Sequence, residues 1–314
     1  MLEPTNSQNL IGSYKLSDTT QGLPNSNAPT LSSSASLAQL NVSVWTAKRL
    51  DKKATAQVAQ ANAAKTKAGN YNKNLLADCQ ELDALKKFVG NARNEHYAMT
   101  LPWSDMGLRL IPTAKLFDYR AHMDDMKMEF DRLTKSFLDV YSFEVSNAMA
   151  TLGNMFSNDD YPPLYEVESK FRWRLTIQPL ADADDFRISI NDEQARVLKA
   201  EYDEFYGDAI RGAANDIWLR LKKNLETLVR QLDTKDNGKP NKLYDSVFDT
   251  AIDLVHMMRD FNLTNDTQME SVRQQLESVL SGKNVEGLRH HMSARTETKN
   301  QVQQVLNSLP TLDF

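Results

Sequence analysis

The chain has 314 residues, of which 41% are apolar and 25% are charged, and its formal net charge is −5. This composition is that of a globular protein with a sizeable core, and no apolar run approaches the roughly 20 residues of a membrane-spanning helix. Glycine (11) and proline (10) are both scarce, which disfavours a turn-rich β protein and favours long helices. A single cysteine, Cys79, excludes an internal disulfide, and the N-terminus lacks a signal-peptide pattern, so we expect a cytoplasmic protein.

Residues 1–36 are rich in Ser, Thr, Asn and Pro and predict a disordered or extended tail. Residues 37–111 form a second region. It begins with alternating apolar residues near Leu40, which predict a short strand. An alanine-rich helix over 54–67 and another helix over 75–99 follow it.

The stretch from residue 41 to residue 74 is strongly basic. It has seven basic residues against Asp51 alone, a balance of +6, so the rest of the chain carries −11. Cations interleaved with aromatic side chains are typical of proteins that grip single-stranded nucleic acid. The candidate nucleic-acid-binding residues here are Trp45, Lys48, Arg49, Lys52, Lys53, Lys65, Lys67, Tyr71 and Lys73. The alternative is that these lysines only form the solvated face of a helix.

A long helical hairpin is predicted over residues 112–234. Apolar residues recur at alternating spacings of three and four from Leu116 to Val140, a heptad seam. A second apolar stripe predicts a helix over 191–233, which we expect to pair antiparallel with the first. Residues 235–314 predict further helices, a small bundle and a tail. The expected fold class is therefore mainly α, an elongated coiled-coil-like hairpin with a β-hairpin insertion and a C-terminal bundle.

The insertion is predicted at residues 170–190, where KFRWRLTIQ and FRISI alternate strictly between polar and apolar residues. Such alternation places its cations on one face, namely Lys170, Arg172, Arg174 and Arg187. They are further candidates for phosphate binding. The alternative is that nearby acidic residues pair with them.

Catalytic motifs are not found: the sequence has no phosphate-binding glycine loop, no nucleophile elbow and no zinc-binding pattern. His122, Asp125 and Glu129 share one side of the long predicted helix and could hold a metal, but they also fit its solvated flank. Cys79 and His96 have no third catalytic partner. We expect a protein that is not an enzyme, without cofactor or metal.

The C-terminus reads LPTLDF. It is similar to the acidic, phenylalanine-terminated ends of bacterial and phage single-strand-binding proteins, which dock into partner proteins. This similarity implies that the tail, Leu312, Asp313 and Phe314, binds a partner.

The run LNVSVWTAKRLDKKA, followed by two long helices that flank a hairpin, resembles an uncharacterised bacterial and bacteriophage family of mostly helical proteins of unknown function. The resemblance covers roughly residues 37–280 and is carried by Leu40, Val42, Val44, Trp45 and the pair Lys48-Arg49. Members are phage-encoded or lie near genes for MoxR-type AAA+ ATPases and von Willebrand-like proteins. The resemblance implies a bacterial host and an adaptor for an AAA+ ATPase, and it supplies no catalytic residue.

Two functions fit these observations. The first is a non-enzymatic interaction or scaffold protein, whose partner is a second copy or an AAA+ ATPase. The alternative is a single-stranded nucleic-acid-binding protein of a phage replication or recombination module, which would use the 45–74 stretch and the 170–187 hairpin. The acidic remainder of the chain would repel a long polyanion, which favours the first hypothesis.

Overall fold

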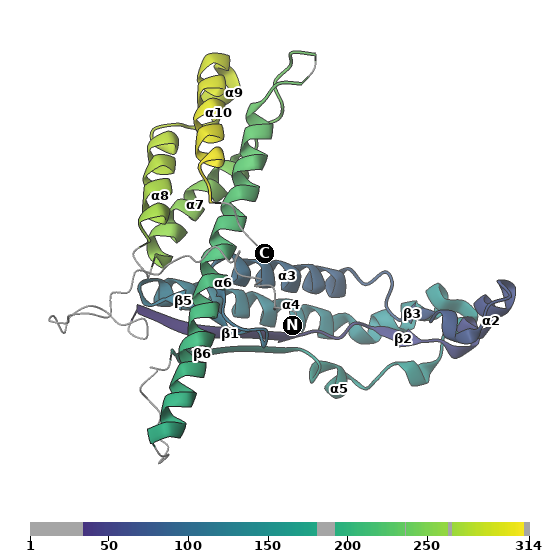
Figure 1. Ribbon diagram of the computed structural model, residues 1–314. Coiled ribbons are helices and arrows are strands. Elements are labelled where there is room, and N and C mark those ends of the chain that lie inside the picture. Colours follow the sequence, from purple (N-terminus) through teal and green to yellow (C-terminus); the bar gives the residue numbers. More distant parts are fainter. Residues whose placement is uncertain (1–33, 181–191, 236, 263–265, 311–314) are drawn as a thin grey trace, which may run out of the picture.

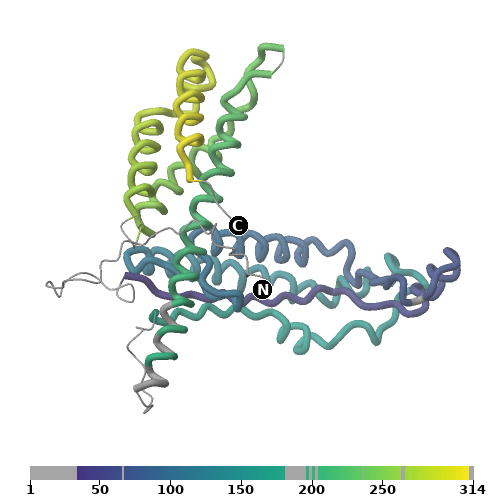
Figure 2. The backbone as a smooth tube through the Cα atoms, in the orientation of Figure 1, coloured from purple at the N-terminus to yellow at the C-terminus, as the bar shows by residue number. Residues whose placement is uncertain are grey.

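The computed structural model describes residues 34–180, 192–235, 237–262 and 266–310 (Figure 1). The protein is mainly helical with a small antiparallel sheet, which confirms the expected fold class in outline. Two parts are distinct in shape. A long arm ends in a small tip, and a single long helix crosses the arm and carries a helical bundle (Figures 1 and 2).

The arm is built on an antiparallel helix pair. The helices α3 (Gln80–Ala98) and α4 (Leu116–Leu152) pack side by side, and a hairpin of β4 (Leu101–Pro102) and β5 (Arg109–Pro112) connects them. The short connection keeps the entropy cost of this pairing low. Sequence periodicity predicted both helices, whereas β4 and β5 are too short to give a pattern.

A four-stranded antiparallel sheet with the order β4-β5-β1-β6 lies along this helix pair. The central strand is β1 (Ala35–Ser43), and β6 (Arg172–Pro179) pairs with it along its length. The expected hairpin over 170–190 is therefore confirmed only in its first strand, whose partner is β1. The expected second strand lies outside the described residues. Both β1 and β6 alternate in polarity, so each has one apolar face to bury.

The apolar face of the sheet packs on α4. Ala38 lies opposite Ile177 and Leu40 opposite Leu175, and these side chains belong to one apolar cluster with the buried Tyr119 and Met123 of α4. Farther along the arm, a second cluster joins the apolar faces of α3 and α4. The heptad positions Tyr119, Met123, Phe130 and Phe137 are all buried, as the seam predicted.

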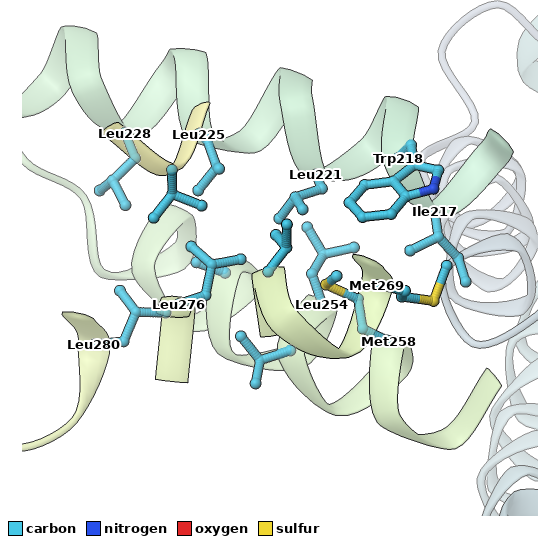
Figure 3. Close-up of a cluster of buried hydrophobic side chains, with 14 of the residues drawn as sticks. Ile217, Trp218, Leu221, Leu225, Leu228, Leu254, Met258, Met269, Leu276 and Leu280 are labelled. Carbon is cyan, nitrogen blue, oxygen red and sulfur yellow. The ribbon is translucent and has the colours of Figure 1, made fainter. Parts of the chain in front are cut away.

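The helix α6 (Asp192–Leu232) crosses the arm and organises the C-terminal part of the chain (Figure 1). Its leucines pack with α7 (Asp245–Phe261), α8 (Thr267–Leu280) and α10 (Met292–Asn307), while the short α9 (Val285–His290) precedes α10. Figure 3 shows the centre of this bundle, where Leu221 and Leu225 of α6 face Leu254 and Leu276.

The expected antiparallel pair of long helices is not confirmed. The apolar stripe of α4 packs on α3 and the sheet, and the stripe of α6 packs on the C-terminal helices. A stripe shows which face of a helix is buried but does not identify the partner. Each long helix packs on helices that are close to it in the chain, because consecutive elements in proteins are usually adjacent in space.

Arm and bundle are joined where α6 crosses β4. Trp103 makes edge-to-face contacts with Phe205 and Tyr206, at centroid distances of 6.3 and 5.0 Å. Farther along α6, Arg220 donates to the backbone oxygens of Ala98 and Thr100 at 3.2 and 3.1 Å. These oxygens lie at the C-terminus of α3, where a cation is favourable and where free carbonyls need donors. The joint is therefore both apolar and hydrogen-bonded.

Candidate binding tip

The far end of the arm is formed by residues 48–74, which we call the tip. Its base is a two-stranded antiparallel ribbon, β2 (Lys48–Leu50) and β3 (Asn72–Asn74), in which Arg49 lies opposite Lys73. The ribbon carries α2 (Lys52–Ala61) and a 3-10 turn (Thr66–Ala68) beyond it (Figure 1). Sequence analysis predicted the helix but not the ribbon, because each strand has only three residues.

A buried carboxylate fixes the ribbon to the arm. Arg49 Nε lies 3.0 Å from Asp160 Oδ1, and Lys73 Nζ contacts the other oxygen of the same carboxylate. Lys73 Nζ also donates to the backbone oxygen of Met155 at 2.7 Å, and its side chain is only 8% exposed. Two of the predicted nucleic-acid-binding cations thus have acidic partners within the protein, since Asp160 pairs with both and Asp51 Oδ2 lies 3.9 Å from Lys73 Nζ. No local pattern marked Asp160, because it follows α4 by several residues and is far in sequence from the ribbon.

The helix α2 is held by its ends and not by packing. Asp51 caps its N-terminus, since Oδ1 accepts from the Ala54 N–H at 2.9 Å. At its C-terminus the N–H of Ala64 donates to Ala59 O at 2.8 Å, and Ala63 adopts a left-handed conformation with φ of 48°. This is a Schellman motif with alanine in the position that usually holds glycine. None of the helix residues is buried. Because isolated helices this short are marginal in water, the caps are needed to hold α2.

Five lysines of the tip are exposed and make no ion pair with any described residue. They are Lys48, Lys52, Lys53, Lys65 and Lys67. Apolar groups lie among them: Leu50, Val58 and Tyr71 are 44%, 52% and 43% exposed. Val58 and Tyr71 line an open groove of about 240 Å³ between α2 and the segment that returns to β3. The tip therefore presents positive charge around a small apolar surface.

Trp45 does not belong to this surface. Its ring packs on Phe137 and Tyr141 at centroid distances of 6.4 and 5.8 Å, within the core of the arm. This packing gives Trp45 a structural role and disfavours its expected role as a base-stacking platform, which stays a prediction. The sequence could not distinguish these roles, since an aromatic residue next to lysines fits both a core and a binding surface.

The cations of the predicted hairpin are spread over different environments. Arg172 and Arg174 lie on the face of β6 that points away from α4, opposite Ser43 and Asn41. Lys170 pairs with Glu166 at 2.9 Å, as the alternative of acidic pairing anticipated, while Arg174 makes no ion pair within the described part of the chain. Arg187 and the C-terminal residues Leu312, Asp313 and Phe314 lie outside the described residues. Arg172 and Arg174 are therefore the hairpin cations left as candidates for an interaction.

A cleft of about 730 Å³ lies at the joint between arm and bundle. Asp118 and Tyr119 of α4 line it together with Lys223 and Asn224 of α6, and α7 closes the opposite side. Its lining cations are largely occupied, since Arg220 pairs with Asp216 at 2.6 Å. Among the described residues that line the cleft, the Thr250 hydroxyl donates to the backbone oxygen of Ser246 at 2.7 Å.

Burial perturbs the pKa values of several titratable groups inside the arm. Burial, helped by the charge of Arg109, lowers the pKa of His96 to about 4, and burial raises the pKa of Tyr119, whose hydroxyl lies 2.8 Å from His96 Nδ1. Burial also raises the pKa of Cys79, so its thiol stays protonated at neutral pH. Cys79 precedes the first turn of α3 and His96 lies in its last turn, which separates the two residues that could have formed a catalytic pair.

No group of three or more potential metal ligands occurs among the residues that the structure describes. The sequence candidates have other partners, because His122 lies 3.7 Å from Glu95 and Glu129 binds Arg132 at 2.7 Å. In the same part of the chain, no helix combines the length and the apolar character needed to cross a membrane.

Comparison of the chain with protein families, curated proteins and solved structures finds no match.

Proposed function

We propose that this chain is a non-enzymatic interaction protein whose arm presents the basic tip to an acidic partner. One observation carries the proposal. The helix α2 buries none of its residues, yet it is held at the end of the arm by caps and by the buried Asp160 anchor. A helix that contributes no fully buried residue to its own fold, but is held firmly in place, is suited to contact another molecule.

The charge of the tip indicates the chemistry of the partner. Its five exposed lysines have no internal counter-charge, and Asp51, the one acidic residue between 41 and 74, is half-buried and caps α2. Bringing these cations against an anionic surface releases their repulsion, and it steers the encounter over a Debye length of about 10 Å. The expected partner is therefore acidic and has an apolar patch that contacts Val58 and Tyr71.

A second candidate is binding to the phosphate backbone of nucleic acid, which the same lysines favour. Trp45 packs on Phe137 and Lys73 pairs with Asp160, so Tyr71 is the exposed aromatic residue that supports this candidate. Without several stacking platforms, the tip would bind single strands through charge alone. The role of an adaptor for an AAA+ ATPase, implied by the resemblance to the phage and bacterial family, stays a prediction about the partner.

The test uses fluorescence anisotropy with two labelled probes, polyglutamate and a single-stranded oligonucleotide, at about 50 and 200 mM salt. We compare the native chain with a variant in which Lys48, Lys52, Lys53, Lys65 and Lys67 are changed to Gln. We expect at least tenfold weaker binding of a probe in the variant, and weaker binding at the higher salt.

A matched control changes five other exposed lysines to Gln, namely Lys87, Lys127, Lys135, Lys222 and Lys239. This control has the same net charge as the tip variant. Equal losses in the two variants would show a general charge effect and would refute a binding role of the tip, as would the absence of binding by the native chain. Preference for the oligonucleotide over polyglutamate would favour the second candidate.

A further inference from the structure

Much of a second surface of this protein is exposed, although Phe205 and Tyr206 at its inner end contact Trp103 of the arm. The first turns of α6 extend past the sheet on the side away from the bundle (Figure 1). No described residue of α6 before Ala213 is buried. We call residues 192–208 the projecting segment.

The projecting segment is acidic. Its sequence contains six acidic residues against two basic ones, a balance of −4. Among those whose side chains are described, Glu201 and Glu204 are exposed and have no ion-pair partner in the described chain. Apolar groups lie beside them, because Val197 and Phe205 are 52% and 48% exposed. The segment thus has the same make-up as the tip with the opposite sign of charge.

The tip and the projecting segment are held apart within one molecule. The ribbon is fixed to the arm through Asp160, and α6 is fixed to the arm at Trp103 and Arg220. The tip lies at the far end of the arm, and α6 crosses the arm near its other end (Figures 1 and 2). The two surfaces therefore meet only between different molecules.

We propose that the tip of one copy docks on the projecting segment of a second copy. This inference rests on the proposed function and names the acidic partner as the chain itself. The lysines of α2 face Glu201 and Glu204, and Val58 and Tyr71 cover Val197 and Phe205. Because the two surfaces differ, the interface is heterologous, and repetition of it joins copies head to tail into a ring or a filament.

Charge reversal tests this interface by sedimentation velocity. One variant carries Lys52→Glu, Lys53→Glu, Lys65→Glu and Lys67→Glu, and the other carries Glu201→Lys, Glu204→Lys and Asp208→Lys, which gives the projecting segment a balance of +2. At about 50 mM salt we expect the native chain to sediment as species heavier than 35.6 kDa and to dissociate toward that mass at about 500 mM salt. Each variant alone should sediment as a monomer, since its tip and projecting segment then have the same sign of charge.

Mixing the two variants is the decisive step. The acidic tip of the first matches the basic segment of the second, and the remaining native surfaces also match, so the mixture should regain the heavier species. Matched controls reverse as many exposed charges elsewhere, and both should associate like the native chain. One carries Lys87→Glu, Lys127→Glu, Lys135→Glu and Lys222→Glu, and the other carries Glu226→Lys, Asp249→Lys and Glu297→Lys. Circular dichroism of each variant confirms that it is folded.

Three results would overturn the inference: a monomeric native chain at low salt, association that survives in both reversed variants, or a mixture that stays monomeric. Association in both reversed variants would show that the interface lies in another part of the chain. A mixture that stays monomeric would show that the tip does not dock on the projecting segment. The anisotropy experiment separates this failure from that of the proposed function. If the chain is monomeric but its tip still binds polyanions, the proposed acidic partner stands and its identification with a second copy is refuted. If the chain is monomeric and the tip binds no polyanion, both proposals are refuted.

Discussion

His96 lies in the last turn of α3, buried against the Tyr119 hydroxyl and near the guanidinium of Arg109. Arg109 donates to the side chain and the backbone of Thr100 at 2.6 and 2.9 Å, so it stays in place as a charge beside the imidazole. Both burial and this charge disfavour the imidazolium form. The imidazole of His96 has a structural role, and its lowered pKa makes the stability of the protein depend on pH.

We expect the protein to lose stability as the pH falls through the range set by His96. Its pKa is about 4 in the folded chain against 6.5 as the ordinary value. The unfolded state therefore binds the proton first, and the free energy of unfolding decreases between those pH values. The loss from this residue should be about 2 kcal/mol between roughly pH 7 and pH 5. Urea unfolding followed by circular dichroism measures it.

His96→Asn provides the comparison, because an amide can keep a hydrogen bond to Tyr119 but does not titrate. Between roughly pH 7 and pH 5, the unfolding free energy of this variant should decrease by about 2 kcal/mol less than that of the native protein. A variant with the pH dependence of the native protein would show that other groups are responsible.

Single residues also show where sequence reasoning stops. The lysines and aromatic residues near residue 45 predicted a single basic and aromatic surface. In the structure, some of these side chains face the interior and others face solvent. Lys73 and Trp45 face inward, while Lys52 and Lys53 stay in solvent. Burial of Lys73 depends on Asp160, and burial of Trp45 on Phe137, residues far away in the chain. Contacts of this kind leave no local spacing to detect.

At the scale of elements, the ribbon of β2 and β3 is held mainly by Asp160. Its carboxylate balances Arg49 and the nearly buried Lys73, and an isolated two-stranded ribbon is only marginally stable. Removing one partner of a buried ion pair leaves an unpaired charge, which typically costs 3–5 kcal/mol. The energetic effect should be local, because the bundle shares no contact with this carboxylate in the described chain.

We therefore expect Asp160→Asn to lower the free energy of local opening of the tip by about 3 kcal/mol without unfolding the rest of the chain. Hydrogen exchange by mass spectrometry should show faster exchange at residues 48–74 and unchanged exchange in α7 and α10. Asp159→Asn is the matched control, since Asp159 is exposed and has no ion-pair partner in the described chain. Equal exchange in the two variants, or faster exchange throughout the chain, would contradict the anchoring role of Asp160.

The elements differ in how well the sequence predicted them. Helices α3, α4 and α6 were predicted because a period of 3.6 is repeated over many turns. β1 and the first strand of the expected hairpin were predicted by alternation. The ribbon and the β4–β5 hairpin were missed, because two to four residues cannot establish a period.

At the scale of the whole molecule, the sequence predicted an elongated helical protein but not its arrangement. The stripes of α4 and α6 fit each other in the sequence, yet each helix packs on other helices. The choice depends on the total buried surface and on chain connections, which a stripe alone does not contain. The arrangement has a functional consequence, because it leaves the tip and much of the projecting segment exposed at separate ends of the protein.

Replacement of the outer tip tests the central claim most directly, namely that α2 serves binding and not folding. Asp51 N–H donates to Tyr71 O at 2.9 Å, so the ribbon can be closed by a two-residue Asn-Gly turn in place of residues 52–70. We expect this chain to unfold with a free energy within about 1 kcal/mol of the native value, since α2 buries no residue. The same chain should lose polyanion binding in the anisotropy assay. A strongly destabilised chain, or one that binds polyanions as the native protein does, would contradict the account.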